Sequence, residues 1–357
     1  MVNIKPQPGI MKIDLYEGGA SELKGQNDVL KLSSNENPFG PSPKAVDAYS
    51  ISGKALHRYP STSHDELRKA ISRILDLQPE NIICGVGSDE IISLLCQTFS
   101  GQGDEVIYTE HGFAMYKISA LAAGATPVVV KEKNRTTDIK NILNKCNENT
   151  KLIFIANPNN PTGTYNNHEE VHSLLKKVPS SVLVVLDCAY FEYVTKDDYV
   201  RPLELLNEFD NLLITKTFSK IHGLASIRVG YGIANPSLIE VLNRIRQPFN
   251  VNSVAQAMAC IAINDHDHIH QSIELNSQQY EFLYNKLLAL GLDCIPSVGN
   301  FITFKGNFVG KEMFNHLMKK GVIVRSVDLY DMKDFIRVTI GTEAENLKFL
   351  SALEELL

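Results

Sequence analysis

The chain has 357 residues, of which 44% are hydrophobic and 21% are charged, and its formal net charge at pH 7 is -6. A chain of this length is long enough for two domains, because single cores stop growing at about 250–300 residues. The acidic balance and the absence of a basic tract argue against a nucleic-acid partner. The sequence has no apolar run of about 18 residues and no apolar signal segment, so we expect a cytoplasmic protein with no membrane association.

The predicted elements begin after a region of weak pattern. Residues 1–34 contain proline and glycine and show little periodicity, so we expect an N-terminal arm that packs with a smaller domain. The large domain is predicted over residues 35–250. Helices should begin at Ser88, ahead of an apolar run, and after Asn167, whose side chain can cap the helix.

Short apolar strands alternate with these helices through the middle of the chain. Such runs, rich in valine and isoleucine, are typical of a mostly parallel sheet that is buried on both faces. The sequence therefore predicts an α/β protein. The predicted strands are 105–109, 126–131, 151–156, 181–187, 211–215 and 231–234.

The C-terminal third combines a long helical pattern with a second group of strands. Residues 251–357 are predicted to form a smaller C-terminal α/β domain. Its strands are expected at 301–306, 321–327 and 335–341, with helices between and after them.

Polar side chains follow the ends of several predicted strands, where open α/β sheets bind their ligands. Residues 84–90, CGVGSDE, form a glycine-containing turn that runs into a helix. The free N–H groups and the dipole of such a helix start suit a phosphate. Residues 156–163, ANPNNPTG, form a proline-fixed turn from which Asn160 can present its amide.

Two further segments carry ionisable groups. Asp187 ends a wholly apolar strand, where a carboxylate is costly unless it meets a positive charge, and Tyr190 follows it. Lys220 follows another apolar strand and lies eight residues before Arg228. The four segments together suit a ligand with a phosphate, a protonatable nitrogen, a phenolic oxygen and a carbonyl that reacts with lysine. Pyridoxal phosphate has all four groups.

The order of these motifs resembles a known family. NPNNPTG, the strand-ending D-x-A-Y and S-K followed by Arg228 resemble the aminotransferases of the aspartate aminotransferase fold. The resemblance covers nearly the whole chain and implies a type I pyridoxal-phosphate transferase fold, with a large domain around a mostly parallel sheet. Further motifs narrow the resemblance to the histidinol-phosphate aminotransferases: LSSNENPFGPSP (32–43), HRYP (57–60), FAMY (113–116), RQPFNVNSVAQAMA (246–259) and IRVTIGT (336–342).

The resemblance implies a role for each matching residue. Lys220 would form the Schiff base and shuttle a proton, and Asp187 would keep the pyridine nitrogen protonated. Tyr190 and Asn160 would hydrogen-bond the phenolic oxygen. Phe113 would stack on the pyridine ring, at a position where many relatives have tyrosine. The phosphate would be held by Ser88, Asp89, Thr217, Ser219 and Arg228, the first two through their backbone N–H groups.

The same resemblance implies the substrates and the assembly. Arg337 would bind the acidic end of the amino substrate, with Arg325 and Tyr16 adding phosphate contacts. Tyr59 would reach the cofactor phosphate of the neighbouring subunit, so a homodimer is expected. The implied reaction, in histidine biosynthesis, exchanges an amino group between L-histidinol phosphate and 2-oxoglutarate, giving imidazole acetol phosphate and L-glutamate.

Several alternatives remain open from the sequence. An aromatic amino-acid aminotransferase or a threonine-phosphate decarboxylase would share the cofactor residues and differ in the substrate pocket.

HEEVH at 168–172 matches a zinc-peptidase pattern, but no third ligand is suggested, so no metal is expected. The six scattered cysteines form no C-x-x-C pair and are read as buried thiols. A regulator that binds the cofactor without catalysis would need a DNA-binding module, for which no residues are left.

Overall fold

The computed structural model describes residues 4–15 and 28–357 of the chain. A seven-stranded sheet forms the centre of the larger part, in the order β2-β8-β7-β6-β5-β3-β4. Neighbouring strands from β7 to β4 pair in parallel, whereas β8 is antiparallel to both β7 and β2. The strands are β2 (Ile82–Gly85), β3 (Glu105–Thr109), β4 (Thr126–Val130), β5 (Thr150–Ala156), β6 (Leu183–Asp187), β7 (Leu212–Thr217) and β8 (Gly230–Ala234).

This sheet confirms the predicted α/β class and its mostly parallel centre. Each strand predicted between residues 105 and 234 is present, with ends that differ by up to two residues. Strand β2 was not predicted, because its four residues lie directly before a turn that the sequence marks more strongly. The predicted cap of Asn167 is confirmed, since its side-chain oxygen accepts from the Glu170 N–H at 3.0 Å and the Glu170 carboxylate accepts from the Asn167 N–H.

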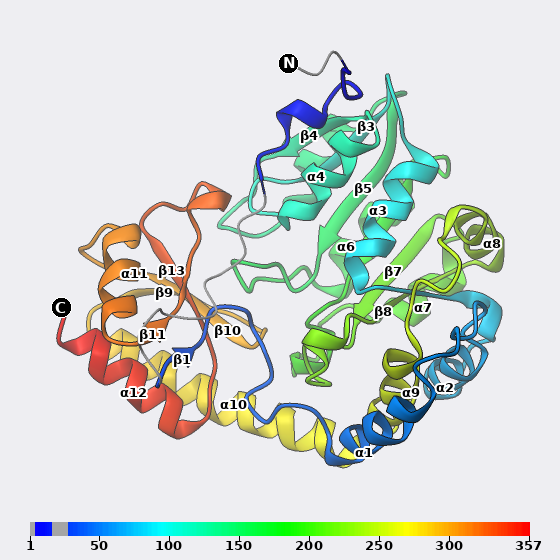
Figure 1. Ribbon diagram of the computed structural model, residues 1–357. Helices are drawn as coiled ribbons and strands as arrows, with labels where there is room; N and C mark the ends of the chain where they lie inside the picture. The colour runs from blue at the N-terminus through cyan, green and yellow to red at the C-terminus, as the bar shows by residue number, and fades with distance from the viewer. Residues whose placement is uncertain (1–3, 16–27) are drawn as a thin grey trace.

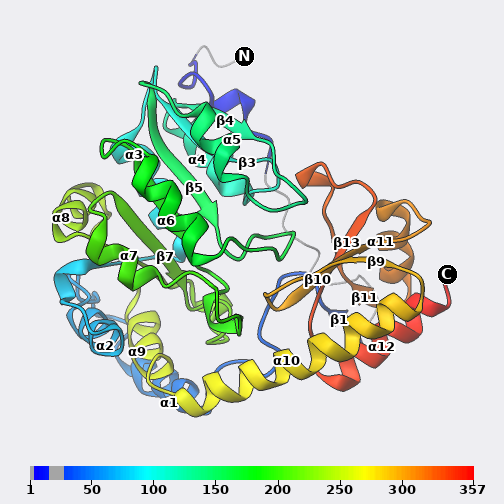
Figure 2. The same ribbon diagram turned by 180° about the vertical axis from the view of Figure 1, so that it is seen from behind.

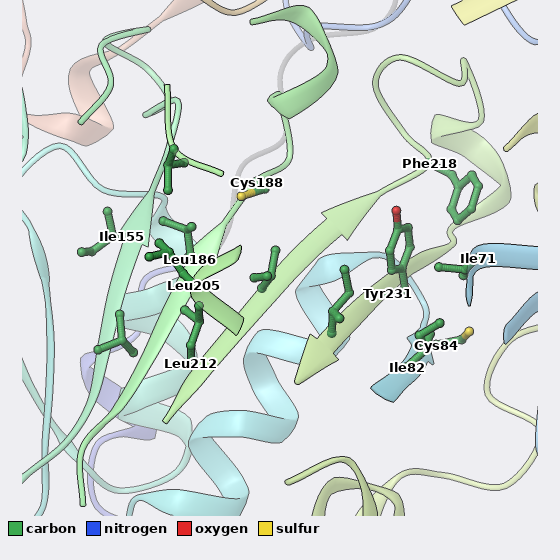
Figure 3. Packing of buried hydrophobic residues seen from close by; sticks show 14 of the residues in the cluster. Ile71, Ile82, Cys84, Ile155, Leu186, Cys188, Leu205, Leu212, Phe218 and Tyr231 are labelled. Carbon is green, nitrogen blue, oxygen red and sulfur yellow. The ribbon is translucent and has the colours of Figure 1, made fainter. Parts of the chain in front are cut away.

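Helices cover both faces of the seven-stranded sheet. One face packs against α3 (Ser88–Phe99), α4 (Ala114–Ala122) and α8 (Pro236–Ile245). The other face packs against α2 (Asp65–Leu75), α5 (Ile139–Lys145), α6 (His168–Lys177), α7 (Pro202–Glu208) and α9 (Ser253–Ala262), with α1 (Pro43–Ser52) alongside α9. Figure 3 shows part of this second layer, in which Ile155, Leu186, Leu212 and Tyr231 come from four neighbouring strands.

A smaller four-stranded antiparallel sheet follows in the chain, in the order β12-β13-β10-β9. Its strands are β9 (Asp293–Ile295), β10 (Phe301–Lys305), β12 (Arg325–Ser326) and β13 (Phe335–Thr339). Helices α10 (His266–Ala289), α11 (Gly310–Lys319) and α12 (Glu343–Glu354) pack with it in a separate hydrophobic cluster. The expected strands at 301–306 and 335–341 are β10 and β13. The strand expected at 321–327 is divided into β11 (Val322–Ile323) and β12.

Two segments connect the larger and the smaller parts. Helix α10 extends from beside α1 and α9 to the smaller sheet, as both Figure 1 and Figure 2 show. The N-terminal segment contributes β1 (Leu30–Lys31), which pairs in parallel with β11, and the 3₁₀ turn η1 (Ile10–Lys12), which lies against α4. The division into an arm and two domains at residues 34 and 250 stays a prediction. Helix α9, just beyond the second boundary, packs with the larger sheet.

Short 3₁₀ turns connect several of these elements. They are η2 (Gly53–Ala55), η3 (Pro79–Asn81), η4 (Phe191–Tyr193), η5 (Ala225–Ile227) and η6 (Asp328–Tyr330). Within residues 4–15 and 28–357, no helix has both the length and the apolar character that a membrane crossing needs.

Candidate active site

A cavity of about 240 Å³ lies where strands β5, β6 and β7 end. This is the edge of a parallel sheet at which ligands bind in α/β proteins. Most of the residues predicted to hold a cofactor line the cavity, although they come from segments far apart in the sequence. They are Ser88, Asp89, Phe113, Asn160, Asp187, Tyr190, Thr217, Ser219, Lys220 and Arg228.

One end of the cavity is built by the start of α3 and by Arg228. Gly87 precedes α3 with a φ of 75°, and a Cβ on it would lie 2.5 Å from the Arg228 guanidinium. A Cβ on Gly230 would likewise lie 2.5 Å from the Ser88 nitrogen. Glycine at these two positions therefore allows the guanidinium and the helix start to approach each other. The hydroxyl of Ser219 accepts from Arg228 Nη1 at 3.3 Å and so belongs to the same group.

The Asp89 side chain faces the arginine. Its Oδ2 accepts from Arg228 Nη2 at 3.0 Å. Burial raises the pKa of Asp89, and the neighbouring Arg228 opposes that rise. The first N–H groups of α3 have no intrahelical acceptor, so they remain for a ligand. The Asp89 side chain is therefore engaged by Arg228, and its backbone N–H is among the first N–H groups of α3.

A buried carboxylate, Asp187, also lines the cavity. Asp187 Oδ2 accepts from the Tyr116 hydroxyl at 2.7 Å, and Oδ1 accepts from the Ala189 N–H at 3.2 Å. Burial raises the pKa of Asp187, and the hydrogen bond from Tyr116 lowers it. A positive ligand group beside this carboxylate would favour its charged form further.

Tyr116 is a contact that sequence reasoning missed. It lies on α4, three residues after Phe113, and its ring stacks on Phe154 with 4.6 Å between the centroids. Phe113 meets it edge-on at 5.8 Å. The signal was available in the motif FAMY, which contains both Phe113 and Tyr116.

Lys220 contacts the segment that follows β1. Its Nζ donates to the Ser34 carbonyl at 2.8 Å. Burial lowers the pKa of Lys220 to about 8, Arg337 lowers it as well, and Glu36 opposes the change. Ser34 and Glu36 also line the cavity, and the sequence analysis did not assign them to the site. They belong to the segment LSSNENPFGPSP, which was quoted for the resemblance alone.

The remaining polar groups connect the two sheets. The Tyr190 hydroxyl accepts from Asn35 Nδ2 at 2.9 Å, and burial raises the pKa of Tyr190 to about 12. Arg337, on β13 and 6% exposed, donates from Nη1 to Asn160 Oδ1 and from Nη2 to the Ser33 carbonyl at 2.6 Å. The smaller sheet therefore contributes a guanidinium to the cavity edge of the larger one.

The loop that carries Asn160 is attached to the smaller part at further points. Val298 N–H donates to the Gly163 carbonyl at 2.9 Å, and the Thr303 hydroxyl donates to the Pro161 carbonyl. Gly163 has a φ of 76°, and a Cβ on it would lie 2.2 Å from the Ser297 hydroxyl. This close approach needs glycine.

The other predicted residues lie elsewhere. Arg325 lines a neighbouring cavity of about 610 Å³ beside α4 and α11. The Tyr59 ring is 82% exposed and stacks on Phe249, with 4.6 Å between the centroids. Tyr16 falls outside the described residues.

The histidines of HEEVH have other partners. His168 Nδ1 accepts from the Arg201 N–H at 3.2 Å, and His172 Nε2 lies 2.9 Å from Glu208 Oε1. In the described part of the chain, no three His, Cys, Asp or Glu side chains are grouped to hold a metal ion.

Comparison with known proteins identifies the family. The family model of class I and II aminotransferases matches residues 27–353. The histidinol-phosphate aminotransferase of Ruegeria sp. (strain TM1040) is 48% identical over 345 residues, which cover 96% of this chain and 95% of the relative. The chain belongs to the class I and II aminotransferases, in the group of histidinol-phosphate aminotransferases.

Two further proteins named histidinol-phosphate aminotransferase resemble the chain, one in sequence and one in fold. The histidinol-phosphate aminotransferase of Jannaschia sp. (strain CCS1) is 46% identical, over 99% of this chain and 98% of the relative. The crystal structure of the Sinorhizobium meliloti histidinol-phosphate aminotransferase with pyridoxal 5'-phosphate superposes with a TM-score of 0.92. It covers 100% of this chain and 98% of its own, at 24% identity. At that identity, the likeness shows the type I fold of the aminotransferases.

The donor set of the cavity fits pyridoxal phosphate. An anion is suited by the α3 N-terminus, the Arg228 guanidinium and nearby hydroxyls, with no Cβ at Gly87 to fill the space. A protonated ring nitrogen is suited by the buried Asp187 carboxylate, and a phenolic oxygen by the Tyr190 hydroxyl. A reactive carbonyl is suited by Lys220, because its lowered pKa leaves much of the amine neutral near pH 8.

Proposed function

We propose that this aminotransferase moves an amino group between L-histidinol phosphate and 2-oxoglutarate, with pyridoxal phosphate as cofactor, in histidine biosynthesis. The products are imidazole acetol phosphate and L-glutamate. The observation that carries the proposal is that Lys220, Asp187 and Arg228 line one cavity. The choice of substrate is supported by relatives of that name, which are 46–48% identical over almost the full chain.

Each residue of the cavity has a proposed task. Bound pyridoxal phosphate supplies an electron sink for the substrate's α-carbon. Lys220 would hold the cofactor through its amine and, as a neutral amine, would move the proton from the substrate's α-carbon to the cofactor's C4′. Asp187 holds the proton of the ring nitrogen, and Tyr190 with Asn160 donates to the phenolic oxygen. The phosphate group is held by Ser88, Asp89, Thr217, Ser219 and Arg228, and Phe113 stacks on the ring.

The substrate end and the assembly are also proposed. Arg337 binds the phosphate of histidinol phosphate, because a guanidinium fork matches a phosphate, and Arg325 and Tyr16 add contacts.

We further propose a cytoplasmic homodimer in which Tyr59 reaches the partner's site. Exposed apolar side chains support it: Phe249, which stacks on Tyr59, and Val46, Tyr49, Ile51 and Leu56 on α1 and the segment that follows it. Sedimentation at micromolar concentration should give twice the chain mass of 39.7 kDa. A monomer under those conditions would contradict the dimer.

An absorbance titration tests the function. The purified protein is loaded with pyridoxal phosphate, and L-histidinol phosphate, phenylalanine and threonine phosphate are added in separate cuvettes. We expect histidinol phosphate to deplete the visible band at a far lower concentration than the other amines. Depletion by another amine would favour the aromatic aminotransferase or the decarboxylase. A protein without any visible band after cofactor addition would refute the cofactor assignment.

Replacing Arg337 with alanine should raise the KM for histidinol phosphate by about 10–100-fold, because charge-assisted hydrogen bonds contribute about 1.5–3 kcal/mol. Steady-state kinetics measure the change. The matched control is Arg244→Ala, which removes an exposed arginine paired with Glu240 on α8 and should leave kcat/KM unchanged. An unaltered kcat/KM in the Arg337 variant would remove this arginine from the substrate site.

The rate of covalent cofactor loading should depend on pH through Lys220. Below about pH 8 the amine is protonated and does not attack a carbonyl, so the rate should rise with pH and level off above about 8. An ordinary exposed lysine would keep accelerating toward its pKa of about 10.4. Stopped-flow absorbance of the ligand-free protein mixed with pyridoxal phosphate measures the profile. A rate that still climbs between pH 9 and 10 would contradict the lowered pKa.

A further inference from the structure

A second lysine close to the cavity, Lys216 of β7, has a buried partner outside the cavity. Its Nζ lies 2.7 Å from Glu192 Oε1, and the two side chains are only 10% and 16% exposed. The same Nζ lies 4.2 Å from the ring centroid of Phe191. One ammonium group on β7 therefore contacts two consecutive residues of the turn η4, by an ion pair and by a cation–π contact.

Lys216 lies on the face of the sheet opposite the cavity. Side chains alternate between the two faces along a strand, and Thr217, the next residue of β7, lines the cavity. Lys216 is in register with Tyr231 of β8 and faces the same layer, which Figure 3 shows around Tyr231 and Cys188. The Lys216–Glu192 ion pair therefore lies outside the cavity and is largely shielded from solvent.

The turn that this pair reaches directly follows Tyr190. Backbone hydrogen bonds within the segment are local: Phe191 N–H to the Cys188 carbonyl at 3.1 Å and Tyr193 N–H to the Tyr190 carbonyl at 3.2 Å. Ahead of Tyr190, the Cys188 N–H donates to the Thr215 carbonyl of β7 at 2.9 Å, so the backbone attaches the start of this segment to β7. Beyond Tyr190, the side chains of Lys216 and Glu192 add a contact between η4 and β7, and the Phe191 ring lies against the Lys216 ammonium.

The stability of the fold alone does not explain why an ion pair, and not two apolar side chains, occupies this buried position. Two apolar side chains of similar volume are often as stable as a buried ion pair, because both charges lose their hydration. Burial lowers the pKa of Lys216, but Glu192, Tyr231 and Cys188 together raise it above the ordinary value. The Lys216 ammonium is therefore charged at neutral pH, and the directional geometry of its contact with Glu192 fixes two segments relative to each other more closely than apolar contact would.

We propose that the Lys216–Glu192 pair is a positioning device, which fixes the Tyr190 hydroxyl relative to Lys220 from behind the sheet. Tyr190 precedes η4, and Lys220 follows Lys216 by four residues. Lys220 Nζ lies 5.6 Å from the Tyr190 ring centroid. The Tyr190 hydroxyl accepts from Asn35, so its own hydrogen remains for an acceptor in the cavity. This inference rests on the proposed function, in which that acceptor is the cofactor's phenolic oxygen.

The pH titration of the visible band of the loaded enzyme tests the proposal. A hydrogen bond to the charged form of the phenolic oxygen lowers the band's pH midpoint, so loss of the bond raises it. Glu192→Gln should raise the midpoint by about half a unit or more, in the direction of Tyr190→Phe. The double variant Glu192→Gln/Tyr190→Phe should show little further shift, because both changes act through one hydroxyl.

Three variants separate positioning from simple loss of stability. Asp265→Asn breaks another ion pair, with Lys44, and should lower the melting temperature without moving the midpoint. Lys216→Arg keeps the cation and should stay near the parent midpoint. Lys216→Met/Glu192→Met removes both charges and should recover much of the stability lost in Glu192→Gln while the midpoint stays raised.

The positioning of Tyr190 and the anchoring of η4 can be contradicted separately. An unchanged midpoint in Glu192→Gln, with a lowered melting temperature, would overturn the positioning role and leave a structural one. Hydrogen exchange of residues 188–194 in the ligand-free Glu192→Gln variant gives a second readout. Exchange as slow in this variant as in the ligand-free parent protein would show that the ion pair does not anchor η4. If the parent protein shows no visible band, the proposed function fails, and exchange alone then decides whether η4 is anchored.

Discussion

Turnover should fall by at least about 10⁴-fold when Lys220 is replaced by alanine, because the substitution removes both the attacking amine and the proton carrier. The cofactor should still bind, since Arg228, Ser219 and the α3 N-terminus are unchanged. Single-turnover mixing with histidinol phosphate measures the remaining rate, and the absorbance of gel-filtered protein measures the bound cofactor.

Lys220→Arg is the matched variant for this experiment. It keeps a cation of similar length but cannot supply a neutral amine, because the pKa of a guanidinium exceeds about 12. We expect the same loss as in Lys220→Ala. A small amine added to the solution should restore part of the activity of the alanine variant, since the missing side chain leaves space beside Ser34. Transamination within tenfold of the parent rate in either variant would exclude the proposed role of Lys220.

A loss of about 10²–10⁴ in kcat is expected for Asp187→Ala, in the range found when a charged or proton-transferring group is removed. The buried carboxylate is the negative group proposed beside the ring nitrogen, and without it a protonated ring would lie in an apolar surrounding. Asp187→Asn keeps the shape of the side chain but not its charge, so its loss should be nearly as large. Steady-state kinetics with saturating cofactor measure both variants.

Tyr116→Phe is the control that isolates the hydrogen bond from the charge. It removes the 2.7 Å contact to Asp187 Oδ2 and keeps the stack on Phe154. A single hydrogen bond to a charged group contributes about 1.5–3 kcal/mol, so the effect should stay within about 10–100-fold. An Asp187→Asn enzyme as active as the parent would show that the ring nitrogen does not need this carboxylate.

The fold was largely predictable because its strands are continuous apolar runs between helices. Such runs give a clear signal when both faces of a sheet are covered. The antiparallel direction of β8 was not predicted, although residues 218–229 before it contain no α-helix and a parallel return needs a crossover of about a dozen residues or more, usually helical. Strand β2 gave no signal of its own, since four residues are too few for a periodic pattern.

The site was predictable where it follows the ends of strands. Lys220, Asp187 and Asn160 carry motifs, and parallel strand ends meet at one edge. Contacts between distant segments were not predictable, because no periodicity relates Ser34 to Lys220 or Asn35 to Tyr190. Lys216 is an intermediate case. The alternation of β7 indicates a lysine on a buried face, but the identity of its partner depends on the path of the chain after Tyr190.

The contact between Arg337 and Asn160 joins the two sheets at the substrate site proposed above. The guanidinium comes from the smaller sheet and the amide from the larger one, and neighbouring hydrogen bonds at Gly163 and Pro161 follow the same seam. A substrate phosphate that binds Arg337 would therefore contact a group that bonds to both sheets. We expect affinity for the acidic end and the relative placement of the two sheets to share one free energy, so that a variant that loosens these contacts alters KM and kcat together.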